Sequence, residues 1–472
     1  MRITLCTHKE AFVIATTTRN IQRIPWIVAL GILLNPLNSS MIAVALLRIG
    51  SGFEISISTV TWLISTYFLA AAIGQPLMGR LADLFGPRRI FVIGLALVGI
   101  SSLLSPWVPS FGWLLALRVV QALGASAAYP AGLSIIRSMD QTLNDGQVKA
   151  SASALGIISI CSNVTAALGP VLGGFLVAMA GWQAIFWVNV PIVLMALIIA
   201  LKWLPADQLN SSEDNRKGKG MLHLIDLPGI VLFSGLLTSL MFFLLSLSDS
   251  PQWGWLIAVP IVGALLIYRE LHTDKPFINV RMLASNRRMV SVFAQFACLN
   301  IVFYSLFFSL PMWLEQVRGY EPQYSGLLML PFAGIGILTT PLAVRIIKKS
   351  GHRQSIVIGN IVLVLGTLLL LLLEPGSPVA FILIVAAVIG IPNGFNNMGL
   401  QTALYSNTKP EHTGAAFGLF QTFRSLGSIL STSLLGLVFS GTVTTAGLHT
   451  IALIAAVISV ALLAVSLSRR LT

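Results

Sequence analysis

The stretch from Ala150 to Leu201 contains no Asp, Glu, Lys, Arg or His. A soluble domain must cover its core with polar surface, and so long an uncharged stretch could not do so. Over all 472 residues, 56% are hydrophobic and 10% are charged. Continuous hydrophobicity over about 20 residues suits a helix that crosses a bilayer, whereas barrel strands would alternate. The sequence therefore predicts a helical protein that spans the membrane many times and is embedded in lipid.

Fourteen candidate spans can be drawn along the chain. They are 25–47, 58–80, 90–107, 111–136, 150–179, 183–203, 226–247, 254–271, 289–314, 322–346, 355–373, 378–406, 413–440 and 445–468. With both termini in the cytoplasm, inner segments hold 25 of the 29 Lys and Arg residues, outer segments hold Arg48 and Arg318, and spans hold Arg118 and Arg424. This asymmetry follows the positive-inside rule. The net charge of +13 is thus explained by orientation, without nucleic acid as a partner.

The chain repeats one loop pattern at a fixed distance. Pro76, Gly86 and Arg88 match Pro341, Gly351 and Arg353 at an offset of 341 − 76 = 265 residues. Six spans need only about 180 residues, so the offset leaves room for two additional helices. The expected organisation is a tail (1–24), a six-helix bundle (25–203), a linker (204–225), two additional helices (226–271), a connection (272–288), a second six-helix bundle (289–468) and a tail (469–472).

Three motifs occur in order within the first half. GRLADLFGPRR contains Gly79, Asp83, Gly86, Arg88 and Arg89 between spans two and three; span four contains Arg118, Gln121 and Gly124; span five contains Gly156, Gly169, Pro170, Gly173 and Gly174. With these motifs, the chain from 25 to 468 resembles the major facilitator superfamily, specifically its fourteen-span branch of drug:proton antiporters. The resemblance implies an all-α membrane fold of two six-helix bundles plus two central helices, and export of small molecules across a bacterial inner membrane without a bound cofactor.

The same resemblance assigns roles to the motifs. The loop acts as a conformational latch through Asp83 and Arg88, Arg118 senses cargo or proton state, and the Gly169-Pro170 segment forms a flexible seal typical of exporters. One position departs from the family pattern, because Asn38 stands where the branch commonly has an Asp. Of the 16 acids, Asp83 and Asp226 are placed at cytoplasmic ends, Glu315 at an outer end and the others in loops or tails. Protons therefore stay an open alternative as the coupling ion.

Polar residues in the spans suggest where cargo binds. Arg118 and Arg424 lack a predicted acidic partner, and a charge near the bilayer centre costs about 3 kcal/mol on the lenient insertion scale. An anionic or neutral amphiphile fits such a site better than a cation does. Candidate residues of the cavity are Asn38, Arg118, Gln121 and Arg424, with Asn35, Asn300, Tyr304, Asn393, Asn396 and Asn397 as possible lining. Alternatively, both arginines and the asparagines only join helices to one another.

Other classes of function are weighed against transport. The sequence has no HExxH, GxSxG or Walker-type motif, which argues against an enzyme, and Cys6, Cys161 and Cys298 show no metal-site spacing. A gradient-driven carrier for an anionic metabolite, or a non-transporting receptor or scaffold with this fold, remain as alternatives to the exporter.

Overall fold

A computed structural model of the chain describes residues 24–143, 149–207, 226–247, 250–273, 277, 280–407 and 413–468, and all regular structure in these ranges is helical. The first half contains α2 (Ile24–Ile32), α3 (Leu34–Met41), the 3₁₀ turn η1 (Ile42–Val44), α4 (Leu46–Gly52), α5 (Ile57–Val60), α6 (Trp62–Phe85), α7 (Pro87–Leu104), η2 (Ser105–Trp107), α8 (Phe111–Leu143), α9 (Lys149–Ala180), α10 (Ala184–Trp187) and α11 (Asn189–Trp203).

The remaining helices form a central pair and a second half. The central pair is α13 (Leu227–Ser246) and α14 (Trp253–His272), and the short α15 (Val280–Ser285) follows it. The second half contains α16 (Arg287–Gln316), α17 (Pro322–Leu328), α18 (Leu330–Ser350), α19 (His352–Leu370), α20 (Val379–Ser406), α21 (Thr413–Val438) and α22 (Thr445–Leu467).

Twelve stretches in the described ranges are long and apolar enough to cross a membrane, so the expected count of fourteen is not supported. The two expected spans that are missing correspond to α9 and α21. Within α9 only Val164–Ala180 counts as a shorter apolar helix. The 26 residues of α21 include Gln421, Arg424 and several Ser and Thr, which lower its mean hydropathy.

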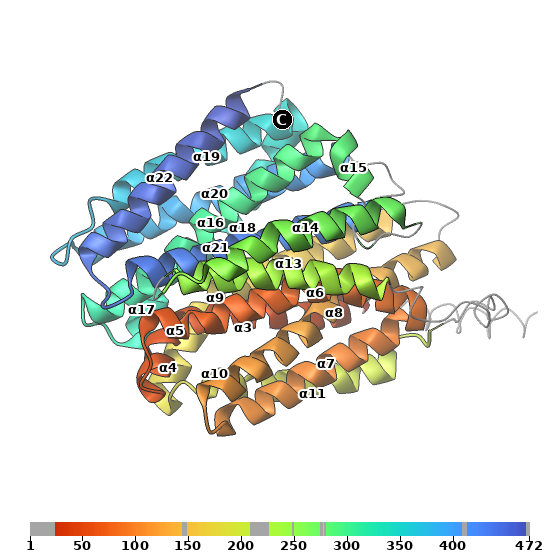
Figure 1. Ribbon diagram of the computed structural model, residues 1–472, viewed down its shortest axis with the longest axis horizontal. Coiled ribbons are helices and arrows are strands. Elements are labelled where there is room, and N and C mark those ends of the chain that lie inside the picture. The colour runs from red at the N-terminus through yellow and green to blue at the C-terminus, as the bar shows by residue number, and fades with distance from the viewer. Residues whose placement is uncertain are drawn as a thin grey trace, which may run out of the picture.

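The helices lie side by side in two groups (Figure 1). In the first group α8 packs on α6 and α7, and in the second α20 packs on α18 and α19, and α16 packs on α21 and α22. Between the groups, α6 packs on α21, and α9 packs on α17 and α18. The pair α13 and α14, drawn in green in Figure 1, reaches both groups because α13 contacts α6 and α21.

The structure repeats the sequence offset of 265 residues in detail. Pro76 lies inside α6 and Pro341 inside α18. Gly86 (φ 97°) precedes α7, and Gly351 (φ 87°) precedes α19. Both glycines adopt backbone angles that other residues rarely take, so the same tight turn joins two helices in each half.

The central pair also corrects one expectation about acids. Glu270 was expected in a loop or tail, but it lies in the last turn of α14 and is only 2% exposed. Glu270 is buried because the helix α14 continues to His272. The Glu270 carboxylate therefore lies close to Gly229, at the start of α13. Nearby, Asp226 pairs with Arg269 at 3.0 Å and caps α13 by accepting a bond from the Gly229 amide. An ion pair and a helix cap thus fasten one end of this helix pair.

Candidate functional site

A network of neutral side chains surrounds Arg118 inside the first half. The Arg118 guanidinium donates to Gln121 Oε1 at 2.6 Å, and Gln121 Nε2 donates to Ser102 Oγ at 2.8 Å and to Asn38 Oδ1 at 3.3 Å. Asn189 Nδ2 donates to the same Asn38 oxygen at 2.8 Å. The network therefore joins the four helices α3, α7, α8 and α11 through the side chains of Gln121 and Asn38.

Arg118 is 1% exposed, and aromatic rings cover its charge. Its guanidinium carbon lies 4.2 Å from the ring centre of Tyr67 and 6.0 Å from that of Phe186. A cation held over desolvated ring faces gains about 2 kcal/mol, which offsets part of the cost of burying it. The sequence missed Tyr67, Ser102 and Asn189, although Asn189 stands out as a polar residue within the uncharged stretch.

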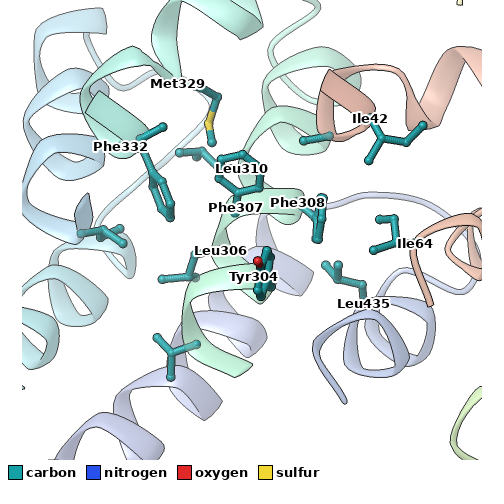
Figure 2. Packing of buried hydrophobic residues seen from close by; sticks show 14 of the residues in the cluster. Ile42, Ile64, Tyr304, Leu306, Phe307, Phe308, Leu310, Met329, Phe332 and Leu435 are labelled. Atoms are coloured by element: carbon teal, nitrogen blue, oxygen red, sulfur yellow. The ribbon is translucent and has the colours of Figure 1, made fainter. Parts of the chain in front are cut away.

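Arg424 lies in a different environment, on α21 of the second half. It is half-buried, and its Nε and Nη2 both donate to the Tyr304 hydroxyl, at 3.1 and 2.9 Å. Tyr304 in turn packs on Phe68 of α6, with ring centres 5.0 Å apart. Figure 2 shows Tyr304 in the buried cluster that also includes Ile64 and Leu435.

The two arginines do not share one polar network, but a chain of rings links them. Tyr67, which covers Arg118, packs edge-on against Phe68 at 5.9 Å. Phe68 packs on Tyr304, the partner of Arg424. Because Tyr67 and Phe68 belong to the first half and Tyr304 to the second, this contact crosses between the halves.

The predicted asparagine group is divided by the structure. Asn300, Asn393 and Asn397 line a cavity of about 10 Å³ within the second half, which has room for about one water molecule. Asn396 instead bonds Asn360 of α19 at 3.0 Å, and Asn38 belongs to the Arg118 network. Asn35 lies half-buried on α3, outside both groups. Asn38 and Asn396 thus each form hydrogen bonds between helices.

The loop between α6 and α7 is held by a residue that the sequence analysis overlooked. Asp207, beyond the end of α11, accepts bonds from the backbone amides of Arg88 at 2.8 Å and Arg89 at 3.1 Å. A carboxylate at the first turn of a helix caps unpaired amides and complements the helix dipole. Gly79 lies on α6 facing Pro130, and the side chain of Asp83 lies outside the described residues.

The two loop copies use the same arginine contact. Arg88 donates to the carbonyl oxygen of Leu201 at 2.6 Å, and Arg353 donates to that of Ser466 at 3.1 Å. The acceptors are also 466 − 201 = 265 residues apart. Each arginine therefore fastens the start of its helix to the last helix of its own half.

The glycine motif on α9 lies between two partners. Gly169 and Gly173 face α3, where added side chains would meet Ser40 and Met41. On the other side, a side chain at Gly174 would overlap the carbonyl oxygen of Pro322, and one at Gly326 would overlap that of Pro170. Small residues permit this close approach of backbones in membranes. The motif thus joins the two halves through α9 and α17, while Gly156 lies further towards the start of α9.

A second cavity lies where the halves meet. It measures about 240 Å³ and is lined from the first half by Leu47, Arg48 and Ser51, and from the second by Glu315, Gln316, Gly319, Tyr320 and Glu321. Charged residues of both signs line it. The sequence analysis had treated Arg48 only as an outer loop cation.

Together, two related helical halves, polar groups buried within spans and a close glycine contact between the halves define a membrane carrier. Residues 28–432 match the family model described as Major Facilitator Superfamily, so the chain belongs to that family and is a transporter, not an enzyme. It is a multi-pass membrane protein that binds a small-molecule substrate.

Three similar proteins support this assignment. The chain is 40% identical over 426 residues to the "Uncharacterized MFS-type transporter YwoD" of Bacillus subtilis (strain 168), covering 89% of this chain and 90% of that protein. It is 28% identical to the "Tetracenomycin C resistance and export protein" of Streptomyces glaucescens, covering 93% and 80%. Among solved structures, a D-xylose-proton symporter aligns with a TM-score of 0.66 at 15% identity over 95% and 97% of the two chains, a likeness that shows the fold.

Proposed function

We propose that this protein is a secondary carrier that exports small amphipathic compounds by alternating access. The observation that carries the proposal is the reciprocal contact of Pro170 and Gly174 with Gly326 and Pro322, which closes the halves against each other at one end. The Ser65 and Thr432 hydroxyls, 2.6 Å apart, join α6 and α21 towards the same end. Small residues let the backbones of α9 and α17 approach closely at this end, and the proposed cycle requires this contact to separate.

The proposed topology assigns this closed end to the outer face. We infer that α9 and α21 are the two remaining spans, because α9 has 32 residues and α21 has 26, and about 20 suffice. Fourteen spans place both termini in the cytoplasm and follow the positive-inside rule. The chain then divides into bundles at 25–203 and 289–468 with two additional helices at 226–271, in a bacterial inner membrane.

In this cycle the proposed latch is the motif at the end of α6 and the start of α7, with Gly79, Asp83, Gly86, Arg88 and Arg89. Asp207 adds to it by holding the start of α7. When the outer end opens, α9 and α17 part, and the cytoplasmic ends of the two halves close. The resemblance to a resistance and export protein favours export as the direction.

The Arg118 network bears on the coupling ion. Asn38 accepts two hydrogen bonds and carries no exchangeable charge, so the Arg118 network offers no carboxylate for a proton. A gradient-driven carrier for an anionic metabolite is the second candidate, and it is favoured because no carboxylate of the described residues pairs with Arg424. Both candidates share the same cycle.

Flux in membrane vesicles tests the proposal. Everted vesicles with and without the protein are given 1-naphthoate, 1-naphthamide and 1-naphthylmethylamine, with and without an imposed pH gradient. Export predicts protein-dependent accumulation of at least one probe inside everted vesicles. Accumulation only in right-side-out vesicles would indicate import, and none in either orientation would favour the receptor or scaffold alternative.

A further inference from the structure

The two arginines within the spans differ in what they can offer a ligand. Arg118 is 1% exposed, lies under the rings of Tyr67 and Phe186, and donates to Gln121. Arg424 is only half-buried. A guanidinium that is almost fully buried cannot reach a cargo molecule without repacking, whereas a half-buried one can.

The bonds of Arg424 leave most of its donors available. A guanidinium has five N–H donors in a planar fork, and Tyr304 takes one from Nε and one from Nη2. Among the described residues the ion pair within 4.0 Å is that of Asp226 with Arg269, so no described carboxylate neutralises Arg424. Its other side can therefore bind an acid in the bidentate manner that suits a guanidinium.

The surroundings of Arg424 favour a cargo with an apolar body. Tyr304 packs on Phe68, on Phe303 at 5.3 Å and on Phe308 at 5.8 Å between ring centres. Asn300, one helical turn before Tyr304, is neutral and lines a small cavity with Phe303, Asn393 and Asn397. A fixed positive charge beside rings and amides is complementary to a planar acid on an apolar, ring-bearing body.

We propose that Arg424 binds the anionic group of the cargo, that Tyr304 holds its guanidinium in place, and that Arg118 is a packing residue that does not touch cargo. This inference rests on the proposed function, since it names the class of compound carried. It places recognition at the contact between halves, where Tyr304 meets Phe68. Movement of the halves would then change the site that holds the acid.

Binding of three probes that share one ring system tests the proposal. Equilibrium dialysis with the full chain in lipid nanodiscs compares 1-naphthoate, 1-naphthamide and 1-naphthylmethylamine, with empty nanodiscs to subtract partition into lipid. We expect 1-naphthoate to bind at least tenfold more tightly than the other two, a difference of about 1.4 kcal/mol, because hydrogen bonds between charged groups are stronger than those to neutral groups.

Substitutions test which residue causes the preference for 1-naphthoate over the other two probes. Arg424→Gln should remove it, Arg424→Lys should retain part of it, and Tyr304→Phe should weaken binding of 1-naphthoate with little effect on 1-naphthamide. Arg288→Gln makes the same charge change at an exposed residue and should leave the preference intact. An undiminished preference in folded Arg424→Gln, or equal binding of the three probes to the natural sequence, including none, would overturn the proposal. Binding is measured without flux, so failure of export in vesicles would not imitate either result.

Discussion

The Asp207 carboxylate occupies the space that a side chain at Gly86 would fill. One residue lies at the turn before α7 and the other beyond the end of α11, and they fit together because Asp207 caps the first turn of α7. The loop motif recognised in the sequence is thus one side of a contact. Its other side is a single acid at the start of the linker.

Asp207→Ala should destabilise the protein by about 1 kcal/mol, as expected for loss of a helix cap. Gly86→Ala should cost more, for two reasons. Alanine rarely adopts the positive φ of this position, and its Cβ would overlap with Asp207. In the double variant the overlaps with Cγ and Oδ2 of Asp207 disappear and only that with Cβ remains, so the loss should be smaller than the sum of the two. Midpoints of unfolding in SDS check this, and strictly additive losses would show that the two residues do not interact.

Gln121→Met should destabilise the first half far more than Ser102→Ala does. Ser102→Ala removes one neutral bond between helices, which contributes about 0.6 kcal/mol in membranes. Gln121→Met also removes the acceptor of Arg118, and a bond to a charged group contributes about 1.5–3 kcal/mol. The same unfolding assay measures both variants. Equal losses would mean that Gln121 does not support Arg118.

Gly174→Ala should push the halves apart at the end that the α9–α17 contact closes. Overpacking costs about 1–3 kcal/mol, enough to shift a two-state equilibrium by roughly fivefold to more than a hundredfold. Gly376→Ala is the control, because no atom would lie within 4 Å of its added side chain.

Spin labels at Ser51→Cys and Tyr324→Cys, both exposed positions, report the separation by pulsed electron spin resonance. The background replaces Cys6, Cys161 and Cys298 with Ala. We expect longer distances to gain population in Gly174→Ala alone. An unchanged distribution in that variant would remove the contact from the proposed cycle.

Much of the fold could be predicted from the sequence, because a membrane-spanning helix must be long, apolar and flanked by a charge bias. The 265-residue offset survives in the structure as paired prolines, paired glycines and paired arginine contacts. The helix α21, which was expected as the span 413–440, is less apolar than the other expected spans that the structure confirms. Its polar face, which includes Arg424, packs against α16 and α6, and it is not among the twelve stretches apolar enough to cross a membrane.

The candidate site was less predictable, because partners in it come from distant parts of the chain. Arg118 and Gln121 were recognisable from their spacing, but Ser102, Asn189 and Tyr67 needed the packing of four helices to appear beside them. Similarly, nothing local separates Arg118 from Arg424. Only their neighbours show that one is enclosed by rings and the other is accessible.

The most direct test of alternating access is to lock the contact between Ser65 and Thr432. Ser65→Cys with Thr432→Cys, in the same cysteine-free background, places two thiols where hydroxyls are now 2.6 Å apart. We predict that oxidation abolishes vesicle flux of the transported naphthalene probe and that reduction restores it, while each single-cysteine variant is unaffected. If fully cross-linked protein transports the probe as fast as the same variant does after its disulfide is reduced, the claim that the halves must separate at this end is contradicted.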